Sequence, residues 1–172
     1  MSRRQVLRGA ALLAALAAFV PASAPVAAAG STELLVTGMT FVGSRGSVSE
    51  LVLRAERAVF HPERDLAELE VVHASVASED DGESFEMTCD RIDLNVETND
   101  FFARGRVRGV TGDGQRYTAP WVKYDHASDL LYTDAPVTMV DGTGSFRGDG
   151  FRYNIAARSF KLLGNVTVVQ GP

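Results

Sequence analysis

Cysteine and lysine are nearly missing from this chain of 172 residues. The only cysteine is Cys89, so the chain cannot form an intrachain disulfide or build a zinc site from cysteines. The chain also has only three histidines, which argues against a histidine-rich metal site. We therefore expect no metal site, and no motif points to another cofactor.

Basic residues are also few once the N-terminus is set aside. Residues 1–29 contain three of the 17 basic residues and none of the 22 acidic ones, so the rest of the chain carries a net charge of −8. Binding to nucleic acid requires a basic surface that contacts phosphates. The charge balance therefore argues against a nucleic-acid partner.

Residues 1–29 have the order of an export signal: three arginines, an apolar run, and small residues around Pro21 and Pro25. They also resemble a twin-arginine signal, so general secretory and twin-arginine export are both open. Because the two prolines interrupt the apolar run, we favour cleavage over retention as a membrane anchor, which stays the alternative. Either way residues 30–172 lie outside the cytoplasm, and a lone Cys89 in an oxidising compartment is expected to be buried.

No apolar pattern with a helical period and useful length follows Gly30. Short alternating runs rich in Val, Leu, Phe, Tyr and Thr are instead separated by turn sequences such as Asp113-Gly114 and Gly148-Asp149-Gly150. This pattern predicts an all-β domain over residues 30–172.

The β region contains an internal repeat. Ala55, Cys89, Ala119 and Gly148 mark equivalent anchor positions that are 34, 30 and 29 residues apart. Apolar residues follow three and five positions after each anchor, then a polar turn and two further apolar positions. In repeat order, the four matching sets are Ala58, Ile92, Val122 and Phe151; Phe60, Leu94, Tyr124 and Tyr153; Leu66, Phe101, Leu130 and Phe160; and Val72, Val107, Val137 and Val166.

The spacing predicts about four bent hairpins. Positions three and five after the anchor share one face of a strand, so the anchor needs a bulge or corner to face the same side. Stacked hairpins of this kind form an open curled sheet or a flattened barrel. Its interior either packs as a solid core or lines a cavity. The predicted interior residues are Leu53, Ala55, Phe60, Met87, Ile92, Leu94, Phe101, Val107, Tyr117, Tyr124, Leu130, Val137, Met139, Phe146, Phe151, Tyr153, Phe160, Leu162 and Val166.

The order of these elements resembles LptC, the periplasmic component of the lipopolysaccharide export machinery. The resemblance rests on residues 53–60, 102–107 with 113–114, 124–125 with 131–137, and 148–151 with 162–166. The related LptA family shares the repeat and is soluble after signal cleavage. The stretch 41–46 and the long first repeat favour LptC over a soluble, LptA-like bridge.

The resemblance implies a β-jellyroll, open along one side, that holds the acyl chains of lipopolysaccharide and has no enzymatic activity. Its partners would be an inner-membrane ABC transporter and a periplasmic bridge protein, and it would work in the periplasm, anchored or soluble. The candidate lipid-groove residues are Leu53, Phe60, Met87, Ile92, Leu94, Phe101, Tyr117, Tyr124, Leu130, Met139, Phe151, Tyr153, Phe160 and Leu162.

Two further surfaces are candidates for contacts. The segment 166–170 is uncharged and β-branched, so Val166, Val168 and Val169 are candidates for a partner edge that pairs with another strand. Arg104, Arg106 and Arg108 alternate with Gly and Val, so they are expected on one outward face. That face is either solvated or contacts lipid phosphates or an acidic partner.

Two classes of function other than transport remain. One is a structural β-repeat protein with a solid core; the other is a carbohydrate-binding module, for which the single Trp121 gives thin support. No nucleophile, base and acid occur in an arrangement that supports catalysis. We therefore expect a protein that is not an enzyme.

Overall fold

The computed structural model describes residues 32–45, 49–78 and 82–170. The predicted signal or anchor segment, residues 1–29, lies outside this part of the chain. Within the described ranges no helix is both long and apolar enough to cross a bilayer. The strands are β1 (Leu34–Arg45), β2 (Ser49–His61), β3 (Leu66–Ser78), β4 (Gly82–Asn95), β5 (Phe101–Thr111), β6 (Arg116–Asp125), β7 (Leu130–Thr133), β8 (Val137–Val140), β9 (Gly144–Gly148), β10 (Gly150–Asn154), β11 (Ser159–Leu163) and β12 (Thr167–Gln170).

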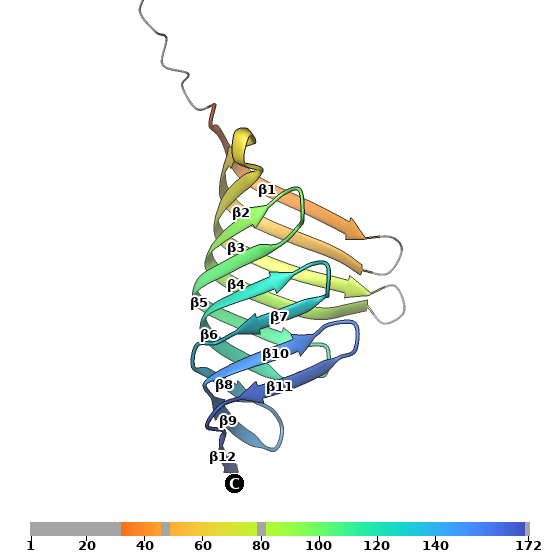
Figure 1. Ribbon diagram of the computed structural model, residues 1–172, viewed down its shortest axis with the longest axis vertical. Coiled ribbons are helices and arrows are strands. Elements are labelled where there is room, and N and C mark those ends of the chain that lie inside the picture. Colours follow the sequence, from red (N-terminus) through yellow and green to blue (C-terminus); the bar gives the residue numbers. More distant parts are fainter. Residues whose placement is uncertain (1–31, 46–48, 79–81, 171–172) are drawn as a thin grey trace, which may run out of the picture. The chain divides into compact units, whose positions relative to one another are not determined.

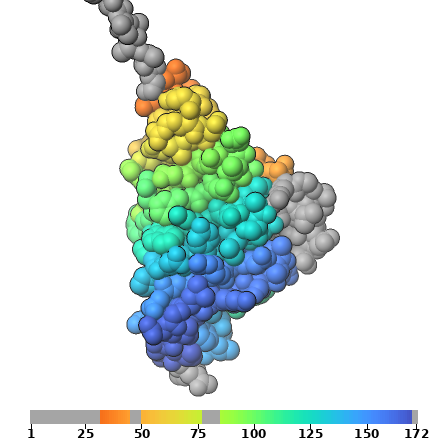
Figure 2. All heavy atoms as spheres, viewed as in Figure 1, coloured from red at the N-terminus to blue at the C-terminus, as the bar shows by residue number. Residues whose placement is uncertain are grey.

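All twelve strands belong to one antiparallel sheet, in which β1 to β7 pair in sequence order (Figure 1). In the space-filling view the colours of the described residues accordingly run in chain order along the domain (Figure 2). A short 3-10 helix, Pro62–Arg64, joins β2 to β3. Alternation of apolar and polar residues explains the strands, because each strand buries one face. The predicted all-β fold is confirmed.

The sheet divides at β6. The end of β6 pairs with β7, whereas its start pairs with β8. β7 continues to β10 and β11, and β8 continues to β9 and β12. Each of the pairs β7–β8, β9–β10 and β11–β12 is therefore one strand broken at a corner, and the sheet is a succession of nine bent strands. We call the halves layer A, which contains β7, β10, β11 and the parts of β1–β6 in register with them, and layer B, which contains β8, β9, β12 and the remaining parts of β1–β6.

The corner between the layers falls where the repeat spacing predicts it. Cys89 is buried, Ile92 three positions later is also buried, and the register of β4 against β5 shifts between Thr88 and Arg91. A second shift occurs in β5, where Gly105 and Arg106 have positive φ angles of 74° and 45°. The extra residue turns the strand, so that apolar positions on both sides of the corner face inward. The corner expected between Cys89 and Ile92 is confirmed, and the extra residue lies opposite it, in β5.

The turns that close layer A share one geometry. Each ends in a residue with a left-handed backbone: Asp65, Asn99, Asp129 and Arg158, with φ between 48° and 64°. In three of these turns a side-chain oxygen accepts hydrogen bonds from backbone N–H groups two or three residues on. The acceptors are Asn95, Asp125 and Asn154. Asn and Asp tolerate both roles, which explains why polar turns recur here.

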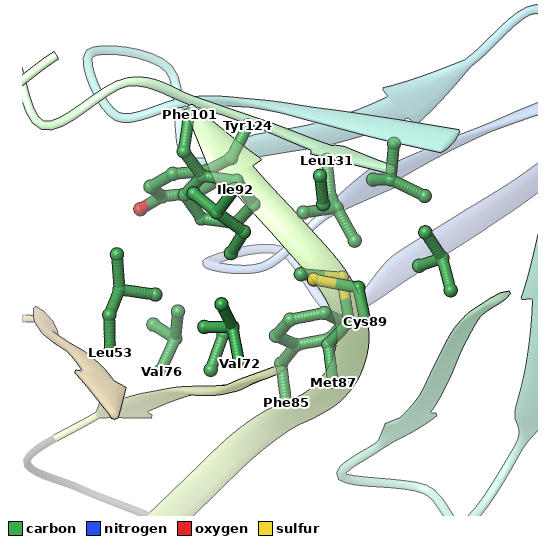
Figure 3. Packing of buried hydrophobic residues seen from close by; sticks show 14 of the residues in the cluster. Leu53, Val72, Val76, Phe85, Met87, Cys89, Ile92, Phe101, Tyr124 and Leu131 are labelled. Carbon is green, nitrogen blue, oxygen red and sulfur yellow. The ribbon is translucent and has the colours of Figure 1, made fainter. Parts of the chain in front are cut away.

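The core lies between the two layers. Figure 3 shows Phe101, Tyr124 and Leu131 of layer A facing Leu53, Val76 and Phe85 of layer B. Most predicted interior residues are buried there, including Cys89, as expected. Two predicted residues are exceptions, and Leu130 is described below. Val166 is 46% exposed, because it lies in the bend between β11 and β12 rather than in a strand. The prediction that Val166 is interior is therefore wrong.

Candidate functional site

The interior is a continuous apolar column that crosses every strand. In layer A it includes one residue from each strand in direct register, and the same holds in layer B. The layer A row is Leu34, Phe60, Ala67, Leu94, Phe101, Tyr124, Leu131, Tyr153 and Phe160. The layer B row is Phe41, Leu53, Ala74, Met87, Gly109, Tyr117, Met139, Phe146 and Val168.

The column is buried in the middle and exposed at both ends. Its central members are at most a few per cent exposed, whereas Leu34 on β1 is 55% exposed and Val168 on β12 is 59% exposed. The half-buried residues also lie toward these ends, among them Met39, Phe160 and Leu162. Water therefore meets apolar surface at both edges of the sheet, which soluble proteins usually avoid.

The structure brings the predicted groove residues together, with one correction. Ten are buried, and Phe60, Phe160 and Leu162 are half-buried. Leu130 is half-exposed and pairs with Asp125, on the face opposite to Leu131, which is fully buried. The alignment erred because Leu130 directly follows the left-handed residue Asp129, whereas Phe101 and Phe160 come one position later in their turns. Leu131 is thus the interior residue at this position, and sequence reasoning also missed the buried Leu51, Leu69 and Phe85.

Aromatic rings close the interior between the layers. The ring of Tyr117 in layer B lies 5.0 Å from Phe151 and 6.3 Å from Phe160 in layer A, and Phe85 lies 6.3 Å from Tyr153. Tyr117 lies directly over Gly109, where any Cβ would collide with its ring. Glycine at position 109 therefore provides the room that the Tyr117 ring occupies.

Tyr117 carries an unusual polar atom for this core. Its hydroxyl is buried and has no hydrogen-bond partner among the described residues. Burial raises the pKa of Tyr117 well above 10, with smaller contributions from Cys89 and Tyr153. Tyr124 differs, since its hydroxyl donates to Asp129 at 3.1 Å and lies 3.3 Å from His126. The layer B wall thus contains a buried hydroxyl that has no partner among the described residues.

The other candidate residues lie outside the interior. Arg104, Arg106 and Arg108 are all exposed, but the bulge at Gly105 places them on both sides of the corner, so the expectation of one shared face is wrong. Arg104 pairs with Asp93 at 3.0 Å, and Arg106 makes a bidentate pair with Asp90.

This pair shifts the pKa values of both its partners. The Arg106 side chain holds the pKa of Asp90 below its ordinary value, and Asp90 raises that of Arg106.

Trp121 lies on the outer face of layer A, where its ring meets Phe102 edge-on at 5.8 Å. At the C-terminal edge, β12 pairs with β9, and the described residues offer its other side no partner strand. Val169 is 60% exposed there. Among the described residues no cluster of three His, Cys, Asp or Glu side chains could hold a metal ion.

Comparisons with known proteins agree with this geometry. A family model described as lipopolysaccharide-assembly, LptC-related, matches residues 105–170, so the resemblance to LptC is confirmed over that part of the chain. The fold is similar to the crystal structure of LptH, the LptA homologous periplasmic component of the conserved lipopolysaccharide transport device from Pseudomonas aeruginosa.

The LptH similarity has a TM-score of 0.56 at 10% identity and covers 71% of this chain and 95% of LptH. It confirms the β-jellyroll. No curated protein matches the sequence significantly.

Proposed function

We propose that the chain is a lipopolysaccharide transport protein without enzymatic activity, which holds the lipid's acyl chains between layers A and B. The observation that carries this proposal is the apolar column, which crosses all nine bent strands and is exposed at both ends. Each buried methylene contributes about 0.8 kcal/mol, so one long acyl chain in water costs on the order of 10 kcal/mol. A continuous apolar interior removes this cost along the whole path.

Acyl chains would enter by separating the layers. The aromatic contacts between Tyr117, Phe151 and Phe160 fill the interior, so a chain must replace them with its own contacts. The exchange is close to neutral, because apolar contacts are lost and regained. The half-buried ends, at Leu34 and Val168, are where such replacement begins most easily.

The sheet edges would supply the connection to partners. Within the described residues β1 pairs only with β2, and β12 pairs only with β9. An unpaired strand can take a partner strand by β-augmentation, which would make the apolar columns of two jellyrolls continuous. We propose an inner-membrane ABC transporter on one side and a periplasmic bridge on the other, with Val168 and Val169 at one docking edge.

Residues 30–172 would then form a periplasmic domain, and residues 1–29 a signal or an anchor. A soluble, LptA-like bridge is the alternative within the same class. The intact mass of the native protein separates the two, since loss of residues 1–29 favours the bridge. A structural protein with a solid core is the second candidate, and the closed aromatic contacts between the layers favour it.

Photo-crosslinking in intact cells tests the proposal. Leu162 is a better site than the fully buried Tyr124, because it is half-buried near an open end and tolerates a larger side chain. A benzophenone amino acid at Leu162 should become attached to lipopolysaccharide on irradiation. The same residue at Lys161, the exposed neighbour on the opposite face, is the matched control. Attachment at neither site, or equally at both, contradicts an interior lipid path.

A further inference from the structure

The outer face of layer B has an unusual composition. In direct register across β5, β6, β8, β9 and β12 stand Arg108, Thr118, Thr138, Arg147 and Thr167. The next outward row, on the same five strands, is Val110, Arg116, Val140, Ser145 and Val169. We call these ten residues the arginine–valine face. It contains no acidic residue, although acids outnumber bases by 22 to 17 in the chain.

The arginines of this face differ from those elsewhere on the sheet. Arg57 and Arg91 share Glu70, Arg104 pairs with Asp93, and Arg152 pairs with Asp134. By contrast, Arg108, Arg116 and Arg147 make no ion pair within the described part of the chain. Arg108 and Arg116 are diagonal neighbours on adjacent strands, so their like charges repel unless an anion lies between them.

The nearest acids do not neutralise this face. Asp141 lies in the turn after β8, where its carboxylate accepts hydrogen bonds from Thr143 and Gly144, which keeps its pKa below the ordinary value. Glu86 flanks the face on β4, in register with Val110, and lines the same hollow as Arg108 and Arg116. It makes no ion pair with them within the described part of the chain, so the three guanidinium groups remain available to an external anion.

Apolar side chains and shallow hollows accompany these charges. Val110, Val140 and Val169 are 38%, 46% and 60% exposed. A hollow of about 240 Å³ is lined by Arg108, Arg116, Thr118 and Glu86 among others, and a second, of about 400 Å³, by Arg106, Arg108, Thr118 and Thr138 among others. Each combines guanidinium groups with hydroxyls, which are the groups that bind phosphate oxygens.

We propose that the arginine–valine face is a peripheral membrane-binding surface that takes an anionic phospholipid bilayer. Arginines attract lipid phosphates, and short valine side chains enter the headgroup region without a deep anchor. A protein partner fits less well, because protein interfaces are usually centred on aromatic residues in pockets, and this face has none. The contact uses side chains on the face of the sheet, including Thr167 and Val169 of β12, so the backbone groups at the edges of β1 and β12 stay free for the partner strands proposed above.

A fluorescent label tests the contact. Burial raises the pKa of Cys89 to about 12, so a new surface cysteine can be labelled selectively in the full chain. Val140→Cys, carrying an environment-sensitive dye, should shift to the blue on adding vesicles with about 30% phosphatidylglycerol, and not with phosphatidylcholine alone. Glu68→Cys, on the outer face of layer A, is the matched label and should not respond, whether or not residues 1–29 bind the vesicle.

Charge variants complete the test. Arg108→Gln with Arg147→Gln should weaken vesicle binding, read from the Val140 label, roughly tenfold or more. The control variant, Arg57→Gln with Arg91→Gln, removes the same net charge from the outer face of layer A. It should change vesicle binding by less than about twofold.

An equal loss of vesicle binding in the two double variants, or no dye shift at position 140, overturns the proposal. A dye shift with inorganic phosphate but not with vesicles would overturn it too, and would make the face a site for free anions. The interior crosslink at Leu162 should persist in all variants, which separates this proposal from the lipid path.

Discussion

The orphan hydroxyl of Tyr117 leads to a prediction about stability. A buried donor without a partner costs about 1–3 kcal/mol, and Tyr117 is fully buried with no partner for its hydroxyl among the described residues. Tyr117→Phe keeps the ring contacts with Phe151 and Phe160 and removes only this cost. We expect the ligand-free variant to be more stable than the wild type by roughly 1–2 kcal/mol, which raises the melting temperature by several degrees.

Urea unfolding and calorimetry measure this effect. The pH dependence supplies a second readout, because a folded-state pKa raised above 10 gives stability that is present below pH 10 and lost above it. The wild type should therefore lose stability above about pH 10 more steeply than Tyr117→Phe.

Tyr132→Phe, on the outer face beside Arg152, is the matched control and should change stability by less than about 0.5 kcal/mol. A less stable Tyr117→Phe would refute the reasoning, since it would show that the hydroxyl has a partner.

Three further outcomes follow from the structure. The buried Cys89, whose pKa is raised to about 12, should react with a thiol reagent only after unfolding; rapid reaction in the native state would contradict its burial. The Arg106 side chain holds the pKa of Asp90 below its ordinary value of 3.8. The ionised Asp90 therefore stabilises the fold at pH values above 3.8, and this contribution is lost as the pH falls through the folded-state pKa. Asp90→Asn should thus lower the urea midpoint at about pH 6 but not at about pH 2; equal effects at both would refute the pairing. Val71 has φ 53° and is exposed, so Val71→Gly should stabilise the domain by up to about 1 kcal/mol in urea unfolding, whereas destabilisation would show that the side chain contributes contacts.

Much of this fold could be predicted because apolar and polar residues alternate along each strand. The anchors Ala55, Cys89 and Ala119 are buried together with the residues three positions later, as the spacing requires when a bulge intervenes. Local alternation also shows its limit at Leu130. The turns of layer A are equally long, since Leu131 lies seven positions after Tyr124 just as Phe101 lies seven positions after Leu94. A residue aligned one position early, such as Leu130, therefore takes the opposite face.

The features that could not be predicted depend on pairing between distant segments. The arginine–valine face takes its residues from five strands, so no stretch of sequence contains it. Conversely, residues close in sequence can lie on different parts of the sheet. The sequence pattern predicts Arg104, Arg106 and Arg108 on one face, but the bend in β5 separates them. Likewise the contact of Tyr117 with Phe151 depends on the distance between layers, which no periodicity encodes.

The separation of layers A and B is the most direct test of the central claim. Spin labels at Thr118→Cys and Lys161→Cys, exposed on the outer faces of opposite layers, report this distance in the purified chain. If acyl chains enter between the layers, adding lipopolysaccharide should lengthen it by about 4 Å, the contact distance of one inserted layer of carbon atoms. An unchanged distance, with lipopolysaccharide shown to be bound, would contradict an interior lipid path and leave a solid core.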